Sequence, residues 1–182
     1  MKDISVGMYR PHMRDIPEHE LHTGYSFRPY KIGDSDSWVH VQRTANIGIG
    51  EVTRQTWVND FSEYEELMPE RSWFVLNPEG KDVASITAWW RGDTDPHQGL
   101  IHWVAVLPEC QGKGMGKAIM TRAMLWLAEQ YDDAYLGTCT LRIPAIKVYL
   151  DFGFEPDMTR DDAEEAWGLI RGVLKHPALG NA

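Results

Sequence analysis

The stretch QGKGMGK, residues 111–117, places three glycines and two lysines directly after the apolar segment IHWVAVLPEC. Glycine lets the backbone approach a ligand closely, because no Cβ stands in the way. Such a loop between a buried strand and a helix directs free N–H groups and the positive end of a helix dipole at an anion. These residues therefore predict a cradle for phosphates.

Two common phosphate motifs do not fit this stretch. The pattern GxxxxGK[ST] requires Ser or Thr after Lys117, where the chain has Ala118, and GxGxxG fails on the spacing of the glycines. The pattern [Q/R]xxGx[G/A] does fit, running from Gln111 to Gly116. Its position after a strand and before a helix strengthens the prediction of a phosphate-binding loop.

Charge is distributed unevenly along the chain. The net charge is -9, yet residues 111–128 contain Lys113, Lys117 and Arg122 and no carboxylate. A basic window in an acidic protein suits a small anion, although a chance fluctuation gives the same pattern. The acidic total argues against nucleic acid as a partner, because phosphodiester backbones bind basic surfaces.

The elements that must position this loop can be predicted from apolar spacing and turn residues. We expect an irregular N-terminal arm over residues 1–23, where polar residues and two prolines dominate. Strands are expected at 25–31, in a hairpin over 72–92, at 100–107 and at 134–141, with the strand at 100–107 covered on both faces. Helices are expected at 35–46, within 52–68, at 115–131, from Pro144 and over 161–174, the last opened by a capping box at Thr159.

Together these elements predict one α+β domain of three layers over residues 1–182, long enough to bury a core. No apolar run reaches the length of a membrane span, and the N-terminus lacks the apolar core of a signal peptide. Cys110 and Cys139 form no CxxC motif, so we expect no metal, no disulfide framework and a reducing cytoplasm.

The sequence resembles the GNAT superfamily of acyl-CoA-dependent N-acyltransferases over residues 72–156. VAVLPECQGKGMGKAIM is similar to motif A of that family, and LRIPAIKVYLDFGFEP is similar to its motif B, in the family's order. The resemblance implies the GNAT fold, a mixed central sheet with splayed central strands flanked by helices. It also implies acetyl-CoA as co-substrate.

The resemblance further implies which residues contact acetyl-CoA. The pyrophosphate would lie on the amides of Gly112 through Lys117, and the pantetheine arm would pair with the strand at Val104 to Val106. The implied contacts are Val104, Ala105, Val106, Gln111, Gly112, Lys113, Gly114, Met115, Gly116, Lys117, Thr140 and Tyr149. The chain departs from motif B at Arg142, where the family often has Asn, so one pantetheine contact differs.

Two side chains are candidates for proton transfer. Tyr149 precedes Gly153 by four residues, where the family commonly has a tyrosine that protonates the departing thiolate; a core position is the alternative. His102 is the candidate base, as in the arylalkylamine N-acetyltransferases of the family, or else a hydrogen-bonded core histidine. Strand alternation predicts that His102, Val104 and Val106 share one face. Cys110 is expected to be a small buried thiol, because the family transfers acyl groups directly.

The sequence says less about the site that would bind the acyl acceptor. Four tryptophans fall where the family builds its acceptor pocket and either bind an amine or pack in the core: Trp38, Trp57, Trp89 and Trp90. An acidic cluster could attract a cationic amine or simply face solvent: Glu63, Glu65, Glu66 and Glu70.

We therefore expect an N-acetyltransferase that modifies the primary amine of a small molecule. Two alternatives stay open: an enzyme that acetylates a protein or peptide, and a non-catalytic sensor that binds acetyl-CoA. A homodimer is also left open.

Overall fold

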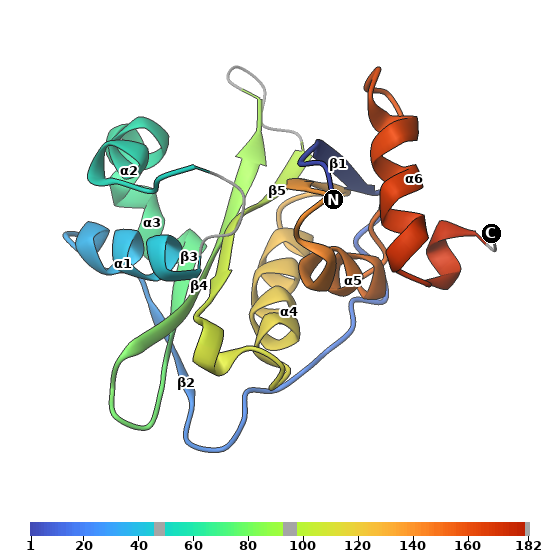
Figure 1. Cartoon of the computed structure of the whole chain (residues 1–182). Helices are drawn as coiled ribbons and strands as arrows, with labels where there is room; N and C mark the ends of the chain where they lie inside the picture. The colour runs from blue at the N-terminus through green and yellow to red at the C-terminus, as the bar shows by residue number, and fades with distance from the viewer. Residues whose placement is uncertain (46–49, 93–97, 181–182) are drawn as a thin grey trace.

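The computed structural model describes residues 1–45, 50–92 and 98–180. Seven strands form a single mixed sheet in the order β2-β3-β4-β5-β6-β1-β7 (Figure 1). All neighbouring strands are antiparallel except β5 and β6, which are parallel. The strands are β1 (Ser5–Arg10), β2 (Ser26–Pro29), β3 (Ser72–Leu76), β4 (Asp82–Arg91), β5 (Gln98–Val106), β6 (Ala134–Cys139) and β7 (Glu155–Pro156).

Helices cover both faces of the sheet. Helix α1 packs on β4 and β5 from one face and α4 packs on the same strands from the other, with α5 beside α4 (Figure 1). The helices are α1 (Ser35–Ala45), α2 (Arg54–Phe61), α3 (Met68–Arg71), α4 (Met115–Ala128), α5 (Ile143–Asp151) and α6 (Ala163–Val173). Short 3₁₀ turns lie at Ser62–Leu67, Pro108–Cys110 and Pro177–Leu179. This confirms the predicted α+β class.

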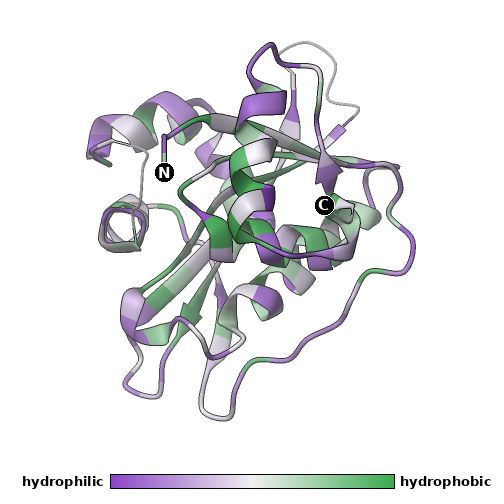
Figure 2. Cartoon of the chain, turned by 45° about the vertical axis from the view of Figure 1, so that its right-hand side comes forward, coloured by the Kyte–Doolittle hydropathy of each residue, from purple (hydrophilic) through white to green (hydrophobic). Residues whose placement is uncertain are grey.

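The core lies in the two layers between sheet and helices. Figure 2 shows the central strands mainly in hydrophobic colours and the surrounding loops mainly in hydrophilic ones. Apolar side chains such as Phe74, Ile86, Ile119 and Met124 are fully buried there. Because both faces of the sheet are covered, β4 is buried along most of its length, as expected of a central strand.

Most predicted elements form within a few residues of their expected bounds, and residue 46, the expected end of the first helix, lies outside the described residues. The capping box at Thr159 is wrong: α6 begins after Asp162 without a side-chain cap. The Thr159 hydroxyl donates instead to Asp157 at 2.7 Å. That local turn uses the side chain that the motif would have needed.

The expected irregular arm is wrong at its start. Strand β1 pairs antiparallel with β6 and β7, joining residues more than 120 positions apart. Its short sequence SVGMYR carries little local signal, and the partners that stabilise it lie near the other end of the chain. Beyond it, the segment crosses α4, where the amide of His19 donates to Thr121 and Thr121 donates to the carbonyl of Pro17.

The central feature of the sheet is a bulge in β5. His102 pairs with Thr87 while Ala105 pairs with Ser85, so β5 has one more residue than β4 across this interval. Trp103 occupies the bulge with φ of 51°, a left-handed conformation that is unfavourable for a bulky side chain. Since paired residues share a face, His102 lies with Ala105, and the predicted grouping of His102 with Val104 and Val106 is wrong.

The bulge coincides with a parting of two strands. β5 pairs with β6 only from Gly99 to Ile101, so in the described chain the edge of β5 at Val104–Val106 has no neighbouring strand on that side. This is the splay of central strands that the GNAT resemblance implied. It opens a gap between β5 and β6, and α4 and α5 line it.

Within the described residues, no helix is long and apolar enough to cross a membrane. The same residues contain no group of three or more His, Cys, Asp or Glu side chains placed to hold a metal ion.

Candidate active site

The glycine loop is built to leave amide groups open to a ligand. Gly112 and Gly114 have φ of 73° and 74°, and no atom lies within 4 Å of the position that a Cβ would take at either residue. Helix α4 begins after Gly114 without a side-chain cap, so its first-turn N–H groups are left for an anion. Gln111 fixes the start of the loop, because its Nε2 donates to the carbonyl of Val106 at 3.0 Å.

A cavity of about 360 Å³ extends from this loop between the free edge of β5 and helix α5. Its size is in the range of ligand pockets. Ten of the predicted contacts line it: Val104, Ala105, Val106, Gln111, Gly112, Gly114, Met115, Gly116, Lys117 and Tyr149. Further walls come from α1, from α5 and from the residue before α5, including Gln42, Val148 and Arg142.

Two predicted acetyl-CoA contacts do not line the cavity. Lys113 is an exposed residue of the loop. Thr140 is fully buried, and its hydroxyl donates to the carbonyl of Lys2 at 2.6 Å and accepts from the amide of Ile4 at 3.0 Å. Thr140 thus holds the N-terminal segment against β6, which sequence patterns could not reveal because β1 itself was not predicted.

Tyr149 reaches the cavity from α5 and is otherwise buried. Burial raises the pKa of Tyr149 to about 12, and the positive charge of Arg142 offsets only part of this rise. The phenol therefore keeps its proton at neutral pH and can donate a hydrogen bond into the cavity. Its ring packs at an angle against Phe154, so the core position and the contact with the cavity are both satisfied.

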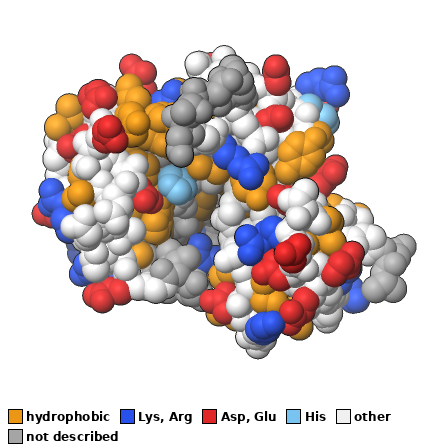
Figure 3. All heavy atoms as spheres, turned by 90° about the horizontal axis from the view of Figure 1, so that it is seen from above, with side chains coloured by type: hydrophobic (Ala, Val, Ile, Leu, Met, Phe, Trp, Pro, Cys, Tyr) orange, Lys and Arg blue, Asp and Glu red, His pale blue; other side chains and the backbone are white. Residues whose placement is uncertain are grey.

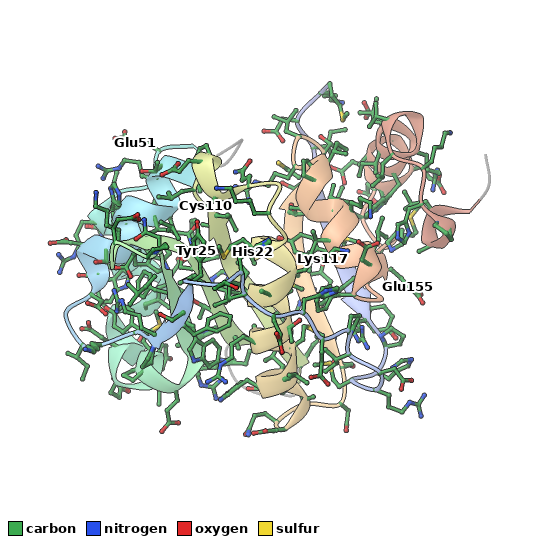
Figure 4. All side chains as sticks on the ribbon, turned by 90° about the horizontal axis from the view of Figure 1, so that it is seen from below. His22, Tyr25, Glu51, Cys110, Lys117 and Glu155 are labelled. Atoms are coloured by element: carbon green, nitrogen blue, oxygen red, sulfur yellow. The ribbon has the colours of Figure 1, made fainter. Side chains whose placement is uncertain are left out.

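Lys117 is held beside the cavity by a carboxylate. Asp151 Oδ2 lies 3.0 Å from Lys117 Nζ and 3.0 Å from Lys147 Nζ, and Asp151 Oδ1 lies 3.1 Å from His176 Nε2. Figure 4 shows Lys117 between α4 and α5 at the lower end of the molecule. Asp151 thus connects the start of α4 to the C-terminal segment.

The ionisation of Asp151 makes stability depend on pH. Burial works to raise the pKa of Asp151, but hydrogen bonds from Lys147, Lys117 and His176 outweigh it and lower the pKa to about 2, from 3.8. A lowered pKa stabilises the fold above pH 3.8, and this contribution is lost as the pH falls toward about 2.

We expect Asp151→Asn to lower the free energy of unfolding by roughly 1–2 kcal/mol at pH 7 and to flatten its decline between pH 4 and 2. Urea denaturation across this pH range measures both effects. Asp36→Asn is the matched control, because Asp36 pairs with Arg54 on the open surface, its side chain 87% exposed. Equal pH profiles for wild type and Asp151→Asn would contradict this account.

His102 lies outside the cavity lining, on the face of β5 that α2 covers. Its Nε2 is 3.6 Å from Asp60 Oδ2, and its ring meets the Phe61 ring at a centroid distance of 5.7 Å. The same Asp60 oxygen accepts the indole N–H of Trp103 at 2.5 Å. Burial works to raise the pKa of Asp60, but His102 and Trp103 outweigh it and lower the pKa, so Asp60 is a carboxylate at neutral pH.

The bulge residue Trp103 is held from two helices. Gln42 on α1 donates from Nε2 to the carbonyl of Trp103 at 2.6 Å and to Ser85 Oγ at 3.0 Å. Asp60 on α2 holds the indole, and Trp38 packs edge-on against it at 4.9 Å. A strained backbone persists only where its surroundings hold it. Sequence reasoning missed Gln42, Asp60 and Trp103, because no motif marks them.

The tryptophans expected to line an acceptor pocket are mostly core residues. Trp38, Trp57 and Trp89 are 0%, 3% and 7% exposed. Trp90 is half-buried and stacks on Trp89 at 4.2 Å, with the Arg71 guanidinium 5.0 Å from its ring. Core packing therefore accounts for these rings without a ligand.

One residue of the predicted acidic cluster, Glu65, stabilises the fold through hydrogen bonds. Glu65 accepts from the hydroxyl of Tyr30 at 2.8 Å and from the amide of Gly33 at 2.9 Å. It thus anchors the turn before α1, whereas Glu63, Glu66 and Glu70 are exposed.

Cys110 is a buried thiol, 3% exposed, in the 3₁₀ turn that follows β5. Tyr25 contacts it, and Figure 4 shows both at the lower end of the molecule. Cys139 is also buried, and burial raises the pKa of its thiol. Neither cysteine faces the cavity.

Comparison with known proteins agrees with this geometry. The acetyltransferase (GNAT) family model matches residues 37–154, more than half of the chain. The chain belongs to this family. A GCN5-related N-acetyltransferase from Sphaerobacter thermophilus shares the GNAT fold, with a TM-score of 0.68 at 18% identity over 85% of this chain and 48% of that one.

Curated proteins with similar sequences match this chain over only part of their own length. A mycothiol acetyltransferase of Pseudarthrobacter chlorophenolicus is 29% identical over 163 residues, covering 86% of this chain and 49% of that protein. An N-acetylaspartate synthetase of Xenopus tropicalis is 27% identical over 106 residues, covering 58% of this chain and 38% of that protein. The chain spans about half the length of the mycothiol acetyltransferases it matches.

Proposed function

We propose that the chain transfers the acetyl group of acetyl-CoA to the primary amine of a small molecule, by direct attack in a ternary complex. One observation carries the proposal: a single cavity joins the uncapped glycine loop to Tyr149 along the free edge of β5. An anion site at one end and a neutral phenol at the other match the two ends of a long thioester substrate.

The residues present fit acetyl-CoA. The amides of the loop and of the first turn of α4, with Lys117 beside them, would hold the pyrophosphate. Gly112 and Gly114 leave space where a side chain would obstruct it. The strand edge at Val104–Val106 would pair with the amide-bearing pantetheine arm, as an added strand does.

The chemistry joins a neutral amine to the thioester carbonyl. A C–N bond forms, the C–S bond breaks, and the electron pair leaves with sulfur; overall, ammonium and thioester give amide, free thiol and one proton. An alkylamine with a pKa of about 10.4 is only about one part in a thousand neutral at pH 7, so a base is useful. Because Tyr149 has a pKa of about 12, well above the ~8.5 of a typical thiol, it stabilises the thiolate as a hydrogen-bond donor.

The names of the curated relatives support a small acceptor, since they refer to mycothiol and to N-acetylaspartate. A thiol-release assay with acetyl-CoA tests the proposal over a panel of small amines and peptides. We expect free thiol only when a small amine is present. Turnover with peptides alone would favour a protein acetyltransferase, and binding of acetyl-CoA without any turnover would favour a sensor.

His102→Gln tests the proposed base. If His102 accepts the amine proton, directly or through water, its removal should slow the transfer. Gln keeps hydrogen bonding but cannot accept the proton, so kcat/KM should fall about tenfold or more. Both proteins are compared with the same acceptor at the same pH, because the amine's own ionisation also affects the rate. A wild-type kcat/KM in the folded variant would remove His102 as the base.

A further inference from the structure

A second site lies on the other side of the bulge from the acetyl-CoA cavity. The glycine loop is at the lower end of the molecule in Figure 1, whereas α2 lies at the upper end. Figure 3 looks onto the upper end and shows it hollowed between two halves, with histidine and hydrophobic side chains at the hollow. Asp60 of α2 and His102 of β5 meet on this side of the sheet.

We propose that Asp60 binds the ammonium group of the acceptor and that the acceptor is therefore a cationic amine. This inference rests on the proposed acetyl transfer and specifies its second substrate. We assign recognition of the amine to Asp60 and not to the tryptophans or the acidic cluster considered from the sequence. Trp38, Trp57 and Trp89 are buried in the core and cannot contact a ligand.

The Asp60 carboxylate is held in a fixed orientation and is accessible to a ligand. Its Oδ2 accepts the Trp103 indole N–H and faces His102 Nε2, which fixes the side chain. Its Oδ1 accepts no hydrogen bond from any described residue. The Asp60 and His102 side chains are 30% and 32% exposed, so a ligand can reach both. An oriented carboxylate with one open oxygen suits an ammonium donor, since charge-assisted hydrogen bonds are the stronger ones.

The neighbouring residues suit the same ligand. The rings of Phe61 and Trp103 lie beside His102, with centroids 5.7 Å and 5.9 Å from the imidazole, and provide apolar walls. His102 is two residues from Val104, so only about 7 Å of strand separates it from the acetyl-CoA cavity. An amine bound at Asp60 would lie next to the proposed base, and the imidazolium formed by taking its proton would face the same carboxylate.

The site also lies where the two central strands part. Trp103 has a left-handed backbone and donates its indole N–H to Asp60, and the pairing of β5 with β6 ends two residues before it, at Ile101. The proposed acceptor carboxylate is thus anchored beside the free edge of β5.

The first test measures binding without turnover. We would titrate phenethylammonium into the CoA-loaded protein and follow the Trp103 indole ¹H–¹⁵N resonance, assigned through Trp103→Phe. We expect a saturable shift in the wild type and in Glu63→Gln, a nearby exposed carboxylate, and none in Asp60→Asn. No shift in the wild type, or an equal shift in Asp60→Asn, would overturn the proposal.

The second test compares a cationic acceptor with a neutral one. In the thiol-release assay, Asp60→Asn should raise KM for phenethylamine about tenfold or more and leave KM for aniline, which is neutral at pH 7, nearly unchanged. An equal rise in KM for both amines would mean that Asp60 only supports the fold, and it would overturn the proposal. Affinity for acetyl-CoA should be unchanged, and a wild type that binds the amine but releases no thiol would count against the acetyl transfer and not against Asp60.

Discussion

Gly114→Asp is expected to weaken acetyl-CoA binding by more than tenfold while the protein remains folded. Gly114 is the residue before α4, and the position of its missing Cβ opens onto empty space beside the uncapped amides. A carboxylate there would occupy the phosphate position and repel the pyrophosphate at short range. Isothermal calorimetry with acetyl-CoA measures the loss, and a thermal scan shows whether the fold persists.

Two controls separate charge from backbone strain in this experiment. Gly114→Asn introduces a side chain of the same size that tolerates the left-handed conformation but carries no charge, so it should lose less affinity. Gly80→Asp repeats the substitution at a turn with φ of 76° and open space, far along the chain from the loop. It should leave acetyl-CoA binding unchanged. Full affinity in folded Gly114→Asp would remove the phosphate assignment of the loop.

Tyr149→Phe is expected to lower kcat by about 10² or more, with little change in acetyl-CoA affinity or thermal stability. The substitution deletes one hydroxyl that borders the cavity and keeps the ring that packs against Phe154. The hydroxyl would contact sulfur only as charge develops on it, so its loss should appear in kcat and not in binding. Because the pKa of Tyr149 is about 12, its ionisation should leave the wild-type rate unaffected below about pH 11.

Tyr135→Phe is the matched control for this variant. Tyr135 lies on β6 away from the cavity, and its hydroxyl donates to Asp157 at 2.9 Å. Its removal should affect stability slightly and kcat not at all. Rates must be measured where chemistry limits turnover, in single-turnover experiments if product release is slow. A wild-type rate for Tyr149→Phe under those conditions would return Tyr149 to a purely structural role.

The glycine-loop half of the candidate site could be predicted from the sequence because its determinants are local. A glycine loop works through its own backbone, and the strand before it and the helix after it are its neighbours in sequence. Gln111 through Gly116 therefore identified the loop, and ten predicted contacts do line one cavity. Thr140 and Lys113 were exceptions, since where a side chain points depends on what packs beside it.

The proposed acceptor half depended on tertiary structure, and the reason is the bulge at Trp103. Alternation along β5 predicted the wrong face for His102, because one extra residue reverses the pattern and nothing in IHWVAVL marks where it falls. Gln42 and Asp60 hold the bulge from helices more than 40 residues away in sequence. The sequence by itself determined the fold class, and it predicted the glycine loop and Tyr149, which line one cavity. Only the packing of α1 and α2 on β5 decided which side chains lie beside the bulge, because long-range contacts leave no local periodicity.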